Sequence, residues 1–158
     1  MPARVTVVEG PEFAKAQAAL LKEARRFQRR VSAAAGRGVD RAYRPALVAA
    51  APQYFPSGYA PVLTPTLQVK TTVRFGGLRP GVAVTVSAPT GGTKGGRDVR
   101  ALEQGSLRHP LFGNKNFWYR TRVKPRWAEL TMRATRPAIV HEIDAELEAV
   151  KRDIEAAA

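Results

Sequence analysis

The chain has 158 residues, of which 44% are hydrophobic, and it carries a formal charge of +13. This length suits one domain with its own core, and the ordinary hydrophobic fraction argues against disorder along the whole chain. The absence of cysteine excludes disulfides, thiolate metal sites and a cysteine nucleophile. The positive charge favours a polyanion or an acidic protein surface as partner, although a basic exterior that only keeps the protein soluble is the alternative.

Residues 4–8 are mostly β-branched, which predicts a short strand or an extended arm. No long apolar run follows them, so they do not look like a signal peptide. No stretch approaches the roughly 18 apolar residues that a membrane-spanning helix needs. We therefore expect a soluble protein, made and used in a cytoplasm, with no membrane partner.

A long amphipathic helix is predicted to begin at Pro11, where the missing N–H costs nothing and Glu12 meets the positive end of the helix dipole. Its inward stripe recurs at three- and four-residue steps. The stripe is Phe13, Gln17, Leu20, Ala24, Phe27 and Val31. The opposite, basic face is Lys15, Lys22, Arg25, Arg26, Arg29 and Arg30. This face is either simply solvated or contacts a polyanion or partner, and Gly36 is expected to end the helix as a left-handed cap.

A second, shorter helix is expected over 39–51, either starting near Arg44 or kinked by Pro45. The prolines of residues 53–66 then predict an extended connection that lies on the body of the protein. Residues 67–75 and 82–87 alternate apolar and polar side chains, which predicts an antiparallel hairpin.

The Gly-rich residues 88–98 lack the spacing of a phosphate-binding loop, so we expect an exposed loop there. Residues 98–103 are read as a further short strand, and 117–123 as the last strand.

The C-terminal helix is expected over 127–156, with Pro137 either kinking it or opening a new helix capped by Thr135. Its apolar stripe is Ile139, Ile143, Leu147, Val150 and Ile154. Its acids are Glu142, Asp144, Glu146, Glu148, Asp153 and Glu155. In a ring, such an acidic helix can lie near the basic surface of a neighbouring subunit.

These elements define a single domain over 1–158, helical over 11–51, β over 67–123 and helical again over 127–156. We expect an α+β fold, in which a small antiparallel sheet of about three to five strands packs against the long N-terminal and C-terminal helices.

Residues 105–119 combine turn formers, cations and large aromatics, which predicts a rigid, packed loop. Phe112 and Trp118 are expected to anchor it to the sheet and the last helix. His109 and Asn114 resemble the pair of a nuclease, but no second histidine or carboxylate cluster completes a metal site nearby. We expect no enzymatic activity, cofactor or metal, and we expect His109 to hydrogen-bond a neighbouring backbone group that holds the loop in shape.

Cations interleave with aromatics in this part of the chain, as in a groove that binds nucleic acid without reading its sequence. The cations are Arg97, Arg100, Arg108, Lys115, Arg120, Arg122, Lys124 and Arg126, and the aromatics are Phe112, Phe117, Trp118 and Tyr119. No helix-turn-helix, zinc-finger or RNP pattern accompanies them. Sequence-independent nucleic-acid binding is therefore the alternative function.

The series Gly105-x-x-Arg108-His109-Pro110-x-Phe112-Gly113-Asn114, followed by Trp118 and a Lys124-Pro125 turn before the last helix, resembles a known family. It is similar to the head–tail joining proteins of long-tailed bacteriophages, of the type found in phages of actinobacteria and described as tail-completion or minor tail components. The resemblance extends over most of the chain, from the long first helix to the last.

The resemblance implies a structural virion protein of the phage neck, assembled in the host cytoplasm. It implies a homo-oligomeric ring, commonly hexameric, between the head connector or stopper protein and the tail terminator or tail tube, around the path of the DNA. The expected assembly residues are Arg97, Arg100, Arg108, His109, Phe112, Asn114, Lys115 and Trp118, together with the basic helix face Arg25, Arg26, Arg29 and Arg30.

Overall fold

The computed structural model describes residues 11–76, 80–89, 98–111 and 114–157. The expectations for residues 4–8, most of 88–98, Phe112 and Gly113 lie outside these residues, as do the side chains expected at positions 13, 15, 17, 20 and 115. The elements are α1 (Pro11–Gly38), a π-helical turn (Val39–Tyr43), α2 (Arg44–Tyr54), α3 (Ala60–Leu63), a 3-10 turn (Thr64–Thr66), β1 (Gln68–Arg74), β2 (Gly81–Ser87), α4 (Val99–Glu103), β3 (Ser106–Leu111), β4 (Asn114–Arg122) and α5 (Trp127–Ala157).

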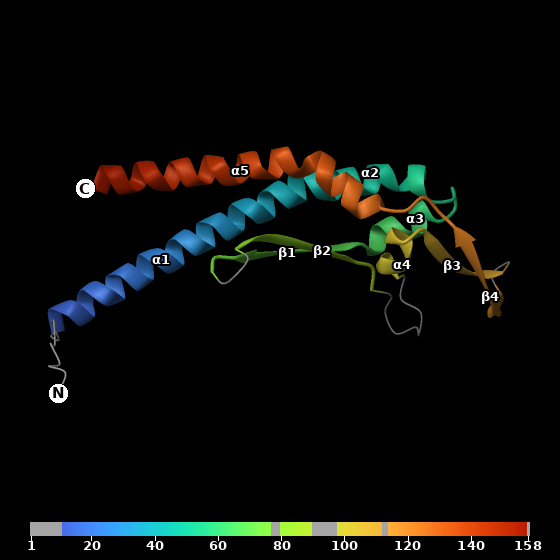
Figure 1. The fold of residues 1–158 in the computed structure, drawn as a ribbon, viewed down its shortest axis with the longest axis horizontal. Helices are drawn as coiled ribbons and strands as arrows, with labels where there is room; N and C mark the ends of the chain where they lie inside the picture. Colours follow the sequence, from blue (N-terminus) through green and yellow to red (C-terminus); the bar gives the residue numbers. More distant parts are fainter. Residues whose placement is uncertain (1–10, 77–79, 90–97, 112–113, 158) are drawn as a thin grey trace, which may run out of the picture.

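The α+β class is confirmed, with long helices at both ends of the chain (Figure 1). The described strands form two separate two-stranded antiparallel sheets, β1–β2 and β3–β4, where one sheet was expected. The strand predicted over 98–103 is wrong, because that segment is helix α4. The Asp98 side chain accepts a hydrogen bond from the Ala101 backbone N–H at 3.1 Å and so caps the helix. This helix separates the two hairpins along the chain.

Helix α1 does not end at a left-handed Gly36, so that prediction is wrong. The chain stays helical through the π-helical turn, in which the Arg44 N–H bonds to the carbonyl of Val39, and continues into α2. Pro45 occupies the first turn of α2. Proline lacks an N–H and its ring crowds the carbonyl four residues earlier, so a regular α-helix cannot pass through it undisturbed. The wider turn absorbs this disturbance without breaking the helix.

Pro137 does not open a new helix, because α5 runs from Trp127 to Ala157 with this proline inside it. Thr135 is not a helix cap: its hydroxyl donates to the Thr131 carbonyl at 2.9 Å, within the same helix.

Helices α1 and α5 run in opposite directions and cross near Gly38 (Figure 1). A Cβ atom at Gly38 would lie 3.1 Å from the Cα of Ile139, so the helices meet backbone to backbone here. From this crossing toward their outer ends, the N-terminal half of α1 and the C-terminal half of α5 diverge.

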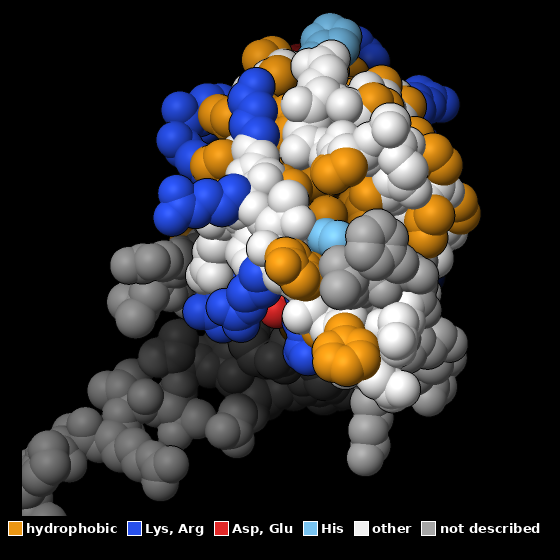
Figure 2. Space-filling view, turned by 90° about the vertical axis from the view of Figure 1, so that its right-hand side faces the viewer, with side chains coloured by type: hydrophobic (Ala, Val, Ile, Leu, Met, Phe, Trp, Pro, Cys, Tyr) orange, Lys and Arg blue, Asp and Glu red, His pale blue; other side chains and the backbone are white. Residues whose placement is uncertain are grey.

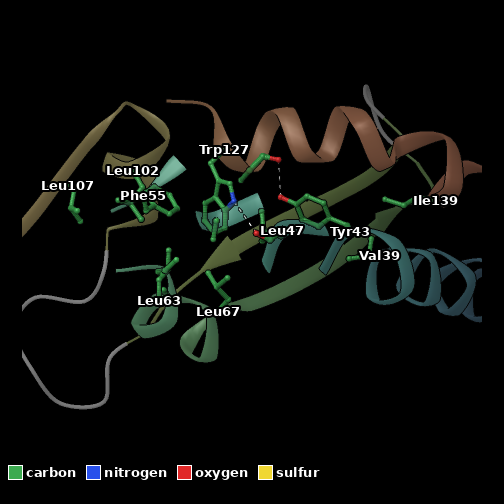
Figure 3. Close-up of a cluster of buried hydrophobic side chains, with 14 residues drawn as sticks. Val39, Tyr43, Leu47, Phe55, Leu63, Leu67, Leu102, Leu107, Trp127 and Ile139 are labelled. Atoms are coloured by element: carbon green, nitrogen blue, oxygen red, sulfur yellow. Dashed lines mark hydrogen bonds between the residues drawn. The ribbon is translucent and has the colours of Figure 1, made fainter. Parts of the chain in front are cut away.

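The hydrophobic core lies at the other end of the helix pair and is centred on Trp127, which is fully buried (Figure 3). Its indole Nε1–H donates to the Leu47 carbonyl at 3.1 Å, and its ring meets that of Phe55 edge to face. The buried Tyr43 hydroxyl donates to the Ala128 carbonyl at 3.1 Å, and burial raises the pKa of this phenol. These contacts join the start of α5 to the π-helical turn and α2.

The β1–β2 hairpin lies alongside α1 and is only thinly covered (Figure 1). Its register pairs Val69 with Val86 and Val73 with Val82, so the valines share one face. That face is at best half-buried, while Lys70 and the other alternating residues are exposed. An edge-to-face contact between Phe75 and Phe27, with ring centroids 6.1 Å apart, holds the far end of the hairpin to α1.

Candidate functional site

Residues 105–116, which were expected to form a loop, mostly belong to the hairpin of β3 and β4. The strand expected over 117–123 is confirmed as the C-terminal part of β4. Gly105 precedes it with a φ of +81°, and an added Cβ atom would lie 2.9 Å from the Val123 carbonyl oxygen. Only glycine fits both conditions. This conformation of Gly105 allows the chain to leave α4 and enter β3 directly.

The register of this hairpin sorts its side chains onto two faces. Arg108 lies opposite Arg120, and Pro110 lies opposite Trp118. Arg122 follows Arg120 by two residues, so it shares their side of the sheet. The arginine face is defined here by Arg108, Arg120 and Arg122, all of which are exposed. Figure 2 views the molecule from the end that carries β3 and β4, where Lys and Arg gather along one margin and acidic side chains are scarce among the described residues.

Trp118 is 42% exposed, so it does not anchor the hairpin in the core, and that prediction is wrong. The guanidinium carbon of Arg108 lies 5.0 Å from the centroid of its ring, a cation–π contact on the surface. The buried tryptophan is Trp127, for which the sequence predicted only a position at the start of the last helix. The physical reason is the period of β4, which directs residue 118 to the same face as the arginines.

His109 and Asn114, two further residues expected at this site, both form hydrogen bonds within the hairpin. The His109 Nε2 atom lies 2.9 Å from the Thr121 Oγ1 atom, which links β3 to β4. The Asn114 side-chain oxygen accepts the Asn116 N–H at 3.0 Å, a local turn at the start of β4. These two contacts shape the backbone that carries the arginine face.

Of the remaining cations of this region, some contact other side chains of the chain and others are exposed. Arg126 forms a two-pronged ion pair with Glu129, at 2.6 and 2.9 Å, and this pair lowers the pKa of the Glu129 carboxyl. The Lys124 ammonium lies 4.7 Å from the ring centroid of Tyr54. Arg100 is exposed on α4, whereas Arg97 lies outside the described residues. The expected basic groove is thus reduced to the arginine face and its neighbours.

The second candidate surface is the basic face of α1. At the end of this face nearest the crossing with α5, Arg30 is paired with acids of the same chain. The Arg30 Nε atom lies 2.6 Å from a Glu146 oxygen, and the same guanidinium pairs with Asp153. Hydrogen bonds from Arg30 lower the pKa of both carboxyls. The acidic helix that was expected to meet a neighbouring subunit therefore first pairs with the helix α1 of its own chain.

The same pattern continues through Arg37 at the end of α1 and Arg41 in the π-helical turn, two arginines that the sequence analysis did not select. Arg37 donates to Glu146 at 3.0 Å, and Arg41 donates to Glu142 at 3.0 Å. A sequence signal existed: two arginines four residues apart match two glutamates four residues apart on another amphipathic helix. Only the packing of α1 against α5 turns that match into contacts.

Beyond these ion pairs the basic face is exposed. Arg25 and Arg29 make no ion pair with another described residue, and Arg26 lies 4.0 Å from Glu23 of the same helix. Leu21 is 53% exposed on α1, and Ile154 is 65% exposed on α5. Both lie on the diverging parts of the two helices.

Among the residues that the structure describes, no three His, Asp or Glu side chains are grouped closely enough to hold a metal ion. Within the same residues, no helix has the length and apolar character to cross a membrane. The chain matches no family model, no curated protein and no solved structure. The two surfaces and the motif around His109 are therefore the features that bear on its function.

Proposed function

We propose that this protein is a structural subunit of a phage neck, which assembles with copies of itself into a ring between the head connector and the tail. In this role it catalyses no reaction. The observation that carries the proposal is the divergence of α1 from α5, which leaves the side chains of residues 21–29 of α1 and residues 151–156 of α5 exposed.

An unpacked helix of this length is marginal in water, because most helical stability in proteins comes from burial of an amphipathic face. Residues 21–29 of α1 are all exposed, and Leu21 and Phe27 lie among them. On α5, Ile154 is the counterpart. Phe27 already contacts Phe75 of its own chain, but Leu21 and Ile154 are more exposed, and a subunit that exposes them in this way is suited to bury them against a partner.

Charge complementarity favours a second copy of the chain as that partner. On α1, Arg25 and Arg29 form no ion pair with a described residue. On α5, the same holds for three acids, Asp144, Glu148 and Glu155. The chain already pairs Arg30 and Arg37 of α1 with Glu146 of α5 internally. The same chemistry between the α1 of one copy and the α5 of the next extends this pattern across a subunit boundary.

The sequence motif supplies the biological setting of the proposal. The Arg108-His109-Pro110-x-Phe112-Gly113-Asn114 series is the feature similar to head–tail joining proteins. A hexameric ring, contacts with a head connector or stopper and with a tail terminator or tube, and location in the virion follow from that similarity as parts of the proposal.

The test is the mass of the purified protein, measured by light scattering and native mass spectrometry, alone and mixed with connector and tail proteins of the same phage. We expect a closed oligomer alone or on mixing. The double variant Leu21→Ser/Ile154→Ser should raise the protein concentration needed for assembly at least about tenfold, since two apolar contacts are lost. Val62→Ser, at an exposed apolar residue of α3, is the control. A protein that stays monomeric in every mixture would contradict the proposal.

A further inference from the structure

We infer that the arginine face of the β3–β4 hairpin binds single-stranded nucleic acid, with Arg108, Arg120 and Arg122 on the phosphates and Trp118 against a base. The inference concerns a different surface from the diverging helix ends of the proposed ring, and it stands or falls independently of that ring.

The first argument is electrostatic. Arg108 and Arg120 lie directly opposite each other in the register, and like charges in this relation destabilise a sheet. None of the three arginines of the face forms an ion pair with a described carboxylate. Binding of an anion between the guanidinium groups removes this repulsion, so the hairpin is built to gain stability from a polyanion.

The contrast with other arginines of the chain strengthens this argument. Arg30, Arg37, Arg41 and Arg126 all have carboxylate partners within 3.0 Å. The chain therefore neutralises arginines where its own acids lie near them. The arginine face is where three arginines share one side of a hairpin and no described acid pairs with any of them.

The second argument concerns the spacing of the charges. Directly opposed residues have Cβ atoms about 5 Å apart, and residues two apart on a strand are separated by about 6.8 Å. Arg120 and Arg122 thus form a row along β4, with Arg108 beside it on β3. A row of guanidinium groups that can bind phosphate oxygens in a two-pronged manner suits a backbone that repeats a phosphate.

The third argument separates nucleic acid from an acidic protein. Trp118 continues the row of Arg122 and Arg120 along β4, and part of its ring is open to solvent while Arg108 lies over it. An exposed indole beside a row of cations is the combination with which proteins hold unpaired bases and their backbone together. An acidic peptide has use for the arginines but none for the ring. Unpaired bases also expose the faces that duplex bases keep stacked, so a single strand is favoured over a duplex.

The experiment titrates the protein into a fluorescently labelled single strand of about 20 mixed nucleotides at several salt concentrations, a length that exceeds the strand site of one small domain. We expect saturable binding that weakens steeply with salt. Arg120→Ala/Arg122→Ala should weaken binding about tenfold or more at low salt, through loss of two phosphate contacts. Lys151→Ala/Arg152→Ala removes the same charge from exposed residues of α5, and it should change the affinity less than about twofold.

A second variant isolates the base contact. Trp118→Ala should weaken binding of the single strand about fivefold or more, with no change in the binding of polyglutamate. In the wild-type protein, the single strand should quench the fluorescence of Trp118, while Trp127 is buried and contributes an unchanged background. Far-UV circular dichroism of each variant checks that the hairpin is intact.

Three results would overturn the inference. Equal losses of affinity in the two charge variants would show that the binding depends only on the net charge of the protein. Polyglutamate that binds as tightly as the single strand, with no effect of Trp118→Ala on either, would assign the face to an acidic protein. A duplex that binds more tightly than the single strand would remove the role given to the indole.

Discussion

The indole N–H of Trp127 donates its hydrogen bond to the carbonyl of Leu47, 80 residues earlier in the chain. This bond ties the first turn of α5 to α2 at the centre of the core. The Glu103 carboxylate strengthens the same junction, since it accepts the backbone N–H groups of Ala128 and Glu129 at the start of α5. The fold therefore depends on one tryptophan in the core, and the other tryptophan lies on the surface.

The two tryptophans should respond oppositely to the same substitution. Trp127→Ala removes a fully buried ring and a hydrogen bond, and we expect it to cost about 3–5 kcal/mol of unfolding free energy, enough to unfold much of the protein. Trp118→Ala should cost under about 1 kcal/mol, because its ring is largely at the surface. Urea unfolding followed by circular dichroism measures both. Similar losses for the two variants would contradict the assignment of Trp127 as the core residue.

Two glycines of α1 provide a matched pair. Gly36 has open space around its Cα, so Gly36→Ala should raise the unfolding free energy by about 0.5–1 kcal/mol through the higher helix propensity of alanine. Gly38→Ala should lose that gain, because its Cβ atom meets the backbone of Ile139 at 3.1 Å and pushes α1 away from α5. Thermal and urea unfolding of the two variants tests this difference. An equal gain in both would show that α1 and α5 do not cross at Gly38.

The ion pairs between α1 and α5 make stability depend on pH. Arg30 holds the pKa of the Glu146 carboxyl below its ordinary value of 4.5. In acid the unfolded chain therefore binds a proton that the folded chain does not, and the folded state loses stability as the pH falls from 4.5 through the lowered pKa. The contribution is fully present above that window. Asp153, whose pKa Arg30 also lowers, acts in the same direction.

Glu146→Gln measures this contribution. The variant should be less stable than the wild type at pH 7, and the difference should shrink as the pH approaches 3. Glu148→Gln is the control, because Glu148 lies on the same helix and makes no ion pair with a described residue. Unfolding curves at several pH values and at two salt concentrations provide the measurement. A constant difference between Glu146→Gln and the wild type across this range would exclude the paired carboxylate as its source.

Individual helices and strands could be predicted from the sequence because the periodicity of neighbouring residues determines them. The stripe of α5 from Ile139 to Ile154 and the alternation of residues 67–75 follow the periods of helix and strand, and both elements were predicted correctly. Residues 98–103 were misread because so short a segment has no period, and the Asp98 cap decides it in favour of a helix. Residues 105–116 were predicted to form a loop because their glycines and proline are typical of turns, whereas only residues 112 and 113 separate β3 from β4.

The sequence by itself determined the α+β class, the two long terminal helices, the excess of positive charge and the motif around His109. Only the tertiary structure decided which tryptophan is buried, which arginines are paired and which are gathered on one face. The physical reason is that periodicity acts over a few residues. Burial and ion pairing, in contrast, join residues such as Leu47 and Trp127 that are far apart in the chain, and these contacts exist only once α1, α2 and α5 have packed.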